Sequence, residues 1–273
     1  MDSGRVVLEW CVKTRIPVFL AVLLLFVAGA ADGSFSFLGT RVIQVGNVYS
    51  ITRLQPTPVG GACPIQGDLE GKLVSSSQMS SYLNCVVPGV DGWIDTVYSS
   101  MPHPAGYLFV PRGVAGSDAS GCPYDEASLH YCLGSQMVYL GESAVWQQYS
   151  TYGDAAPVVV VAHEVTHHFQ RMLRMPHAAD RNGQIPYENQ ADCGAGAFMA
   201  YASGAGMMDP EDDIIDLAGS LAEAGKHDGL EIERDHGKPE ERLAAFDRGY
   251  LSGDAQPMSA CIAYVPGVPI VTQ

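Results

Sequence analysis

The sequence predicts an α+β fold in which two helices that carry metal-ligand residues pack beside a small mixed sheet. The first helix is indicated by V-V-V-V-A-H-E-V-T-H-H-F-Q at 158–170, and the second by E-N-Q-A-D-C-G-A-G at 188–196. Short apolar alternations, typical of strands, precede both helices at 40–51, 107–110 and 136–140. With 273 residues, 47% of them apolar, the chain is long enough to bury a sizeable core.

The N-terminus has the pattern of a targeting segment. Arg5, Lys13 and Arg15 precede an apolar run at 16–31, which is short for a membrane span of about 20 residues. Ala28-Gly29-Ala30 offers a small-residue cleavage site. We therefore expect residues 1–31 to be a secretory signal peptide cut after Ala30, with an uncleaved membrane anchor as the alternative.

Charge excludes one class of partner. The chain has 30 Asp and Glu against 15 Lys and Arg, a formal net charge of −15. Nucleic-acid binding needs clustered Lys and Arg to displace counterions from phosphates, so we expect no nucleic-acid partner.

Several elements are expected before the first motif. Gly, Ser, Thr and Pro dominate 32–62 around one or two strands at 40–51. A helix over 69–83 would bury Leu73, Met79 and Leu83, and 91–98 would continue it after a Pro-Gly turn. Strands at 107–110 and 136–140 follow, with a loop between them.

The segment 163–167 reads H-E-V-T-H. On a helix, His163 and His167 lie one turn apart on the same face, while Glu164 points toward whatever binds on a metal's open side. The helix is expected from Asp154, a candidate N-cap, to about Met175 before Pro176. The alternative is a core helix whose histidines bond to carbonyls, so a third ligand has to decide.

That third ligand is Glu188, twenty-one residues beyond His167. In a helix it shares a face with Asp192, which can accept the free ring N–H of a ligating histidine. The surrounding residues are largely apolar, and buried carboxylates are costly unless they are paired or bound to a metal. Glu188 therefore completes a His-His-Glu set.

Other polar residues near these motifs have expected roles. His168 faces about 100° away from His167 and is expected to pack or hydrogen-bond. Gln170 lies near the metal face, where it could orient a ligand or contact substrate. Downstream we expect an amphipathic helix at 209–223, a loop with His236 and a helix from about Pro239. Arg242 is expected to pair with a buried carboxylate.

Six cysteines remain once Cys11 is removed with the targeting segment. An even number in an exported chain indicates disulfides, although six cysteines allow fifteen connectivities. None has C-x-x-C spacing, so a cysteine-based zinc site is not expected. Of the fifteen, we favour Cys63–Cys85, Cys122–Cys132 and Cys193–Cys261.

The motifs together resemble those of a known family. They are A-H-E-V-T-H-H-F-Q at 162–170, E-N-Q-A-D-C-G-A-G at 188–196, H-G at 236–237 and R-L-A-A-F at 242–246. With Gly249, Gly253 and Cys261, they resemble the bacterial putative neutral zinc metallopeptidases, which are gluzincin-like, over roughly 120–265. Thr166 departs from this pattern, because the family has glycine there. The resemblance implies a zincin-like fold and a peptidase, without giving the substrate.

The resemblance and the residues lead to one mechanism. A single Zn²⁺ would be bound by His163, His167 and Glu188, with Glu164 as general base. The resemblance includes His236, which would stabilise the oxyanion; alternatively it bonds the backbone where its helix begins. In zincin-like proteins an edge strand binds substrate by strand addition, and 136–140 is the candidate by position.

We therefore expect an exported, secreted or cell-envelope zinc metallopeptidase that acts on peptides or proteins. Its core is expected at 120–273 and its N-terminal portion at 32–119, with membrane contact only through an uncleaved N-terminal segment. Two alternatives remain. One is an exported zinc-binding structural or binding protein without catalysis, and the other is a zinc-dependent amidohydrolase acting on non-protein amides.

Overall fold

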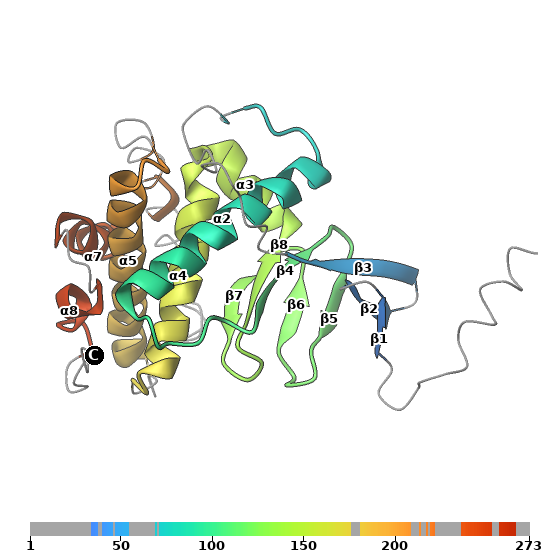
Figure 1. The fold of residues 1–273 in the computed structure, drawn as a ribbon, viewed down its shortest axis with the longest axis horizontal. Helices are drawn as coiled ribbons and strands as arrows, with labels where there is room; N and C mark the ends of the chain where they lie inside the picture. Colours follow the sequence, from blue (N-terminus) through green and yellow to red (C-terminus); the bar gives the residue numbers. More distant parts are fainter. Residues whose placement is uncertain are drawn as a thin grey trace, which may run out of the picture.

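A computed structural model describes most of the chain (Figure 1). The described residues are 34–37, 40–45, 47–54, 69, 71–175, 181–208, 213, 217, 219–221, 236–252 and 257–265. The expected signal or anchor segment at 1–31 and Cys63 lie outside them, as does most of the helix expected at 209–223. Within the described part, no helix combines the length and apolar character that a membrane span needs.

Among the described residues, the main sheet has six strands in the order β1-β2-β3-β4-β8-β7. Its strands pair antiparallel except for β4 and β8, which are parallel. A second sheet pairs β5 with β6. The strands are β1 (Ser34–Phe37), β2 (Thr40–Val45), β3 (Asn47–Arg53), β4 (Gly106–Val110), β5 (Ala115–Ser117), β6 (Pro123–Asp125), β7 (Leu129–Cys132) and β8 (Met137–Gly141).

The sheet corrects two expectations. The stretch between the strands expected at 107–110 and 136–140 is not only loop, because β5, β6 and β7 lie there. The strand expected at the edge, now β8, is internal and pairs with β4 and β7, while β7 is the last of the described strands in this sheet. The strands expected at 107–110 and 136–140 are both present, but an apolar pattern indicates burial and not a strand's place in the sheet.

The helices gather on one side of the sheet (Figure 1). The described helices are α2 (Ser76–Val97), α3 (Glu142–Tyr152), α4 (Ala155–Met172), α5 (Arg181–Gly204), α7 (Pro239–Ser252) and α8 (Pro257–Cys261). Contacts between α4 and α5 and between α5 and α7 bring the segments of all the motifs together.

Helix α2 differs from the expected helix in its start and its length. It begins at Ser76 because the Ser75 side chain caps it by accepting from the Gln78 N–H at 3.3 Å. It runs through Pro88, where a turn was expected. A proline costs one helical hydrogen bond, but the face of α2 is buried on both sides of it. The buried residues around Pro88 include Val86, Val87, Val90, Trp93 and Ile94, and their packing keeps the helix continuous.

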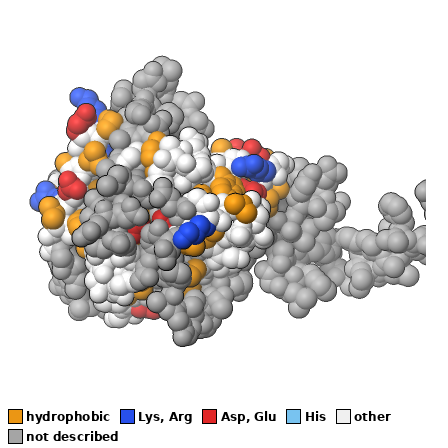
Figure 2. Space-filling model, turned by 90° about the horizontal axis from the view of Figure 1, so that it is seen from above, with side chains coloured by type: hydrophobic (Ala, Val, Ile, Leu, Met, Phe, Trp, Pro, Cys, Tyr) orange, Lys and Arg blue, Asp and Glu red, His pale blue; other side chains and the backbone are white. Residues whose placement is uncertain are grey.

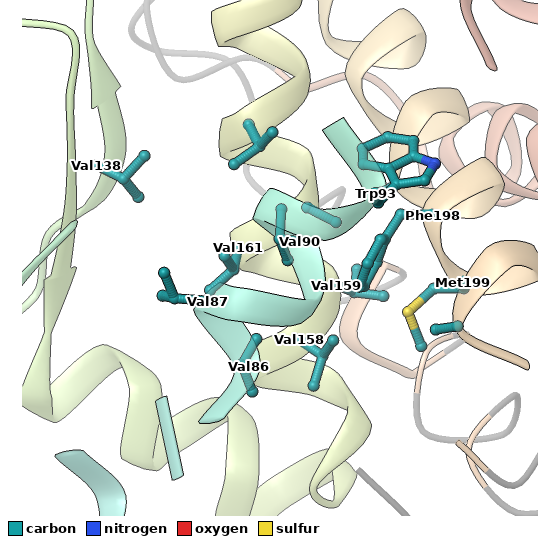
Figure 3. Packing of buried hydrophobic residues seen from close by; sticks show 14 of the residues in the cluster. Val86, Val87, Val90, Trp93, Val138, Val158, Val159, Val161, Phe198 and Met199 are labelled. Carbon is teal, nitrogen blue, oxygen red and sulfur yellow. The ribbon is translucent and has the colours of Figure 1, made fainter. Parts of the chain in front are cut away.

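The valine run before the first histidine is the centre of the core. Val158, Val159 and Val161 of α4 are at most 1% exposed, and they pack among side chains of α2, α5 and the sheet (Figure 3). The Trp93 ring lies 5.2 Å from that of Phe169 and 5.3 Å from that of Phe198. This packing fixes α4 on several sides, and with it the metal-ligand motif.

Large exposed apolar side chains are few among the described residues. They are Val74, Leu133 and Leu251, which lie on different parts of the chain. On the face drawn in Figure 2, apolar and charged side chains of the described residues are interspersed. Scattered apolar residues of this kind are ordinary for a protein surface.

Helices α5 and α7 approach closely through glycines. A Cβ at Gly196 would meet the Phe246 carbonyl oxygen, and one at Gly249 would meet the Cys193 carbonyl oxygen. A disulfide between Cys193 and Cys261, with an S–S length of 2.07 Å, joins α5 to α8. The close approach places residues of α7 beside the ligand-bearing part of α5.

Replacing Gly196 by alanine should separate these helices. We expect Gly196→Ala to lower the free energy of unfolding by about 1–3 kcal/mol, because the added methyl group overpacks the helix contact. Urea unfolding measures this change. Gly204→Ala is the matched control, because it lies on the same helix with nothing within 4 Å of its Cβ position. Equal unfolding midpoints for the two variants would contradict the close packing of α5 and α7.

Candidate metal centre

Helix α4 places the two histidines of the motif on one face. His163 is 5% exposed, and its Nε2 lies 3.2 Å from Nε2 of His167. The two rings are nearly perpendicular, with centroids 4.8 Å apart. Two imidazole nitrogens held this close in a buried site can reach one ion.

Helix α5 brings Glu188 to the same point. Its Oε2 lies 3.1 Å from His163 Nε2 and 3.4 Å from His167 Nε2. The three ligand atoms lie within 4.8 Å of one another. Two imidazole nitrogens and one carboxylate oxygen suit zinc and leave a fourth tetrahedral position open. The spatial arrangement expected from the sequence is therefore present.

Both histidines have partners that turn Nε2 toward this point. Asp192 Oδ1 accepts from His163 Nδ1 at 2.8 Å, and Gln170 Oε1 accepts from His167 Nδ1 at 2.7 Å. The Gln170 amide is oriented because its Nε2 donates to the Tyr187 carbonyl at 2.8 Å. With hydrogen on Nδ1, the neutral rings offer the Nε2 lone pairs to a metal. Gln170 thus has the orienting position considered from the sequence.

Arg242 of α7 completes this network. Its Nε and Nη2 donate to the two carboxylate oxygens of Asp192 at 2.8 Å and 2.7 Å. Burial alone would raise the pKa of Asp192, but the Arg242 charge and the hydrogen bonds lower it to about 2. Asp192 therefore stays ionised. Arg242 is 4% exposed and has the carboxylate partner that the sequence led us to expect.

His236 lies at the outer side of the ligand cluster. Its Nδ1 is 2.8 Å from Glu188 Oε2, and its side chain is 32% exposed. Its ring centroid is 6.0 Å from that of His163. The partner of Nδ1 is thus the carboxylate of the candidate ligand Glu188.

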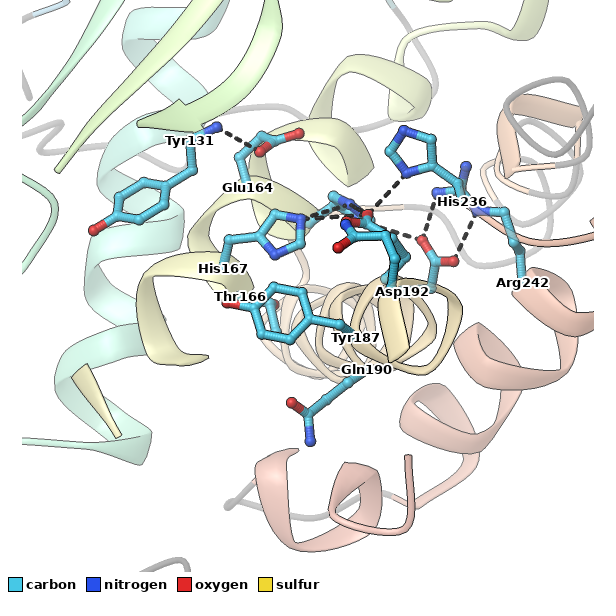
Figure 4. A network of polar contacts seen from close by, with 12 residues as sticks. Tyr131, Glu164, Thr166, His167, Tyr187, Gln190, Asp192, His236 and Arg242 are labelled. Atoms are coloured by element: carbon cyan, nitrogen blue, oxygen red, sulfur yellow. Dashed lines mark hydrogen bonds and ion pairs between the residues drawn. The ribbon is translucent and has the colours of Figure 1, made fainter. Parts of the chain in front are cut away.

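Glu164 has a partner that the sequence did not reveal. Its Oε2 accepts from the backbone N–H of Tyr131 on β7 at 2.7 Å (Figure 4). The carboxylate is buried, with Glu164 only 6% exposed. A backbone donor has no residue signature, so only the register of β7 against α4 could have indicated it.

Thr166 is accommodated by a glycine on the facing helix. A Cβ at Gly194 would meet the Thr166 side chain, and Thr166 Oγ1 donates to the Ala162 carbonyl at 2.9 Å. Thr166 is completely buried. The departure from the family pattern on α4 is therefore matched by the missing side chain on α5, and the ligands are undisturbed.

In the metal-free protein, the contacts among the candidate ligands favour a protonated His163 and an ionised Glu188. Burial opposes protonation of His163, but hydrogen bonds to Asp192 and Glu188 outweigh it and raise its pKa to about 10. Burial would raise the pKa of Glu188, yet the charge of His167 and the hydrogen bonds from the histidines hold it well below its ordinary value. A metal must therefore displace a proton from this cluster.

The raised pKa of His163 predicts how the metal-free protein responds to alkali. In the folded protein the pKa of His163 is about 10, whereas its ordinary value is 6.5. Protonated His163 therefore stabilises the folded state fully below pH 6.5, and this stabilisation is lost as the pH rises through the folded-state pKa. We expect the urea midpoint of chelator-treated protein to fall as the pH rises from about 6.5 to about 10. His163→Gln should show a smaller fall; an identical fall would contradict this origin.

Loss of the Asp192 charge should weaken metal binding. Asp192→Asn cannot hold His163 in the same way, and we expect zinc affinity to drop about 10–100-fold in competition with a chelating dye. Asp95→Asn is the control, since that carboxylate is exposed and contacts His103. Unchanged zinc affinity in Asp192→Asn would exclude the orienting role.

The comparisons with known proteins agree with this geometry. The sequence model of the family described as putative neutral zinc metallopeptidase matches residues 112–261. Uncharacterized proteins of Mycobacterium bovis and Mycobacterium tuberculosis are 27% identical to this chain over 211 residues, covering 66% of this chain and 71% of theirs. No solved structure matches. Because the family model covers more than half of the chain, the protein belongs to the putative neutral zinc metallopeptidase family.

Proposed function

We propose that this protein is a zinc-dependent peptidase that hydrolyses peptide bonds with water. The observation that carries the proposal is the position of Glu164. Its carboxylate lies on the same helix as two of the three candidate ligands, next to His163 in sequence, and is buried and fixed by a hydrogen bond. A site built only to hold zinc has no need of this extra carboxylate.

His163, His167 and Glu188 would hold the ion. Bound zinc supplies a Lewis acid that polarises a carbonyl and makes water easier to deprotonate. Glu164 accepts the proton of the attacking water and then delivers it to the leaving amine. His236, which contacts Glu188 through Nδ1, would stabilise the oxyanion from the Nε2 side of its ring.

The substrate would lie along β7. Among the described strands β7 pairs with β8 alone, and the Tyr131 N–H is directed toward Glu164. A peptide added as a further strand would therefore run past the general base. This strand replaces the internal β8, which the sequence had suggested.

Export is part of the proposal. Disulfides join Cys122 to Cys132 and Cys193 to Cys261, and Cys85 is also disulfide-bonded. Cys63, its expected partner, lies outside the described residues. Such cross-links suit an oxidising compartment, and the N-terminal segment at 1–31 has the pattern of a signal or anchor. The partner we propose is a peptide or protein substrate, with no nucleic acid.

Removing the base and removing a ligand should have different effects. We expect Glu164→Gln to lower kcat/KM on a peptide library about 10²–10⁴-fold while the zinc content stays the same. Glu188→Ala should lose the metal. Full activity in Glu164→Gln would refute its role as base, and unchanged zinc content in Glu188→Ala would remove it from the ligand set.

The same assay separates the other functions. Digestion of the library by the wild-type protein, abolished by a chelator and restored by zinc, would support the peptidase. Zinc binding without cleavage of peptides or simple amides would indicate a binding or structural protein. Cleavage of simple amides alone would indicate an amidohydrolase.

A further inference from the structure

Tyr131 joins β7 to α4 at two points. Its backbone N–H donates to Glu164 Oε2 at 2.7 Å, and its hydroxyl lies 2.9 Å from His168 Nδ1. All three residues are buried, with 8% of Tyr131, 6% of Glu164 and none of His168 exposed. One residue of the strand therefore contacts two residues of the motif helix.

His168 is itself anchored, and this sets the direction of the hydroxyl bond. Its Nε2 lies 2.6 Å from the Pro102 carbonyl oxygen. A carbonyl only accepts, so Nε2 carries the hydrogen, and Nδ1 of the neutral ring accepts from the Tyr131 hydroxyl. The Tyr131 and His168 rings meet edge to face, with centroids 5.5 Å apart.

The spacing of the two contacts follows from helix geometry. Glu164 and His168 are four residues apart, so they lie on the same face of α4, separated by roughly 6 Å along its axis. A tyrosine whose side chain runs along this face can therefore place its backbone N–H at one residue and its hydroxyl at the other. Neighbouring His130 and Tyr139 stack on each other, and Tyr139 packs in the separate apolar cluster.

We propose that Tyr131 and His168 are positioning residues, which form a latch that fixes Glu164 relative to β7, the last described strand of the main sheet. The proposal rests on the function proposed above, in which Glu164 is the base and β7 the substrate strand. The latch keeps the Glu164 carboxylate, the proposed base, at a fixed position relative to the backbone of β7, the proposed substrate strand. Misplacement of either by about 1 Å costs up to about 10²-fold in rate.

The first experiment removes the hydroxyl. We expect Tyr131→Phe, at full zinc content, to lower kcat on a cleaved peptide about 10-fold. Tyr139→Phe is the matched control, because it also removes a buried hydroxyl, on the neighbouring strand β8. This hydroxyl donates to Asp118 at 2.8 Å and not to a residue of α4. We expect its kcat to equal that of the wild type. Equal kcat in wild type and Tyr131→Phe would overturn the latch.

A double variant tests whether the two residues act together. His168→Gln can still donate to Pro102 but no longer offers Nδ1. If Tyr131 acts through His168, the double variant Tyr131→Phe/His168→Gln is no slower than His168→Gln alone. Fully additive losses would overturn the latch, because they would mean that each residue acts separately.

Hydrogen exchange of the Tyr131 amide gives a readout that does not depend on catalysis. In the wild type we expect slow exchange, accelerated about tenfold or more by Glu164→Ala and by Tyr131→Phe, but not by Tyr139→Phe. Fast exchange in the wild type would overturn the latch. A chain with this protection pattern that cleaves no peptide would refute the proposed function and leave the latch intact.

Discussion

The arrangement of the site depends on the buried carboxylate of Asp192. It accepts from His163 of α4 and from Arg242 of α7 while belonging to α5. An isolated carboxylate at this depth costs several kcal/mol, and so does an isolated guanidinium. The three helices must therefore keep their mutual positions for either charge to be tolerated. The glycine contacts between α5 and α7 let Arg242 reach this carboxylate.

The parts of the site that the sequence predicted are those fixed by local spacing. His163 and His167 share a face because helices repeat every 3.6 residues, and Glu188 and Asp192 share one for the same reason. That these two faces meet was an inference from the cost of burying carboxylates, and the structure brings them together. Gln170, three residues after His167, follows the same helical rule.

What the sequence did not predict depends on contacts distant in the chain. Alternation at 136–140 indicated a strand, but its internal place follows from pairing with β4 and β7. Pro88 suggested a turn, yet the burial of α2 on both sides of it outweighs the lost hydrogen bond. Thr166 departed from the expected pattern, and the α4 sequence alone could not show how it is accommodated, because its complement, Gly194, lies on another helix.

The two disulfides between described cysteines lie where the site most needs rigidity. Cys132 directly follows Tyr131, whose N–H holds Glu164, and it is bonded to Cys122. Cys193 directly follows Asp192, which holds His163, and it is bonded to Cys261. Each cross-link is thus one residue away from a group that orients a catalytic or ligand side chain. Because rate depends on holding reacting groups in place, these bonds stabilise the strand and the helix that supply those groups.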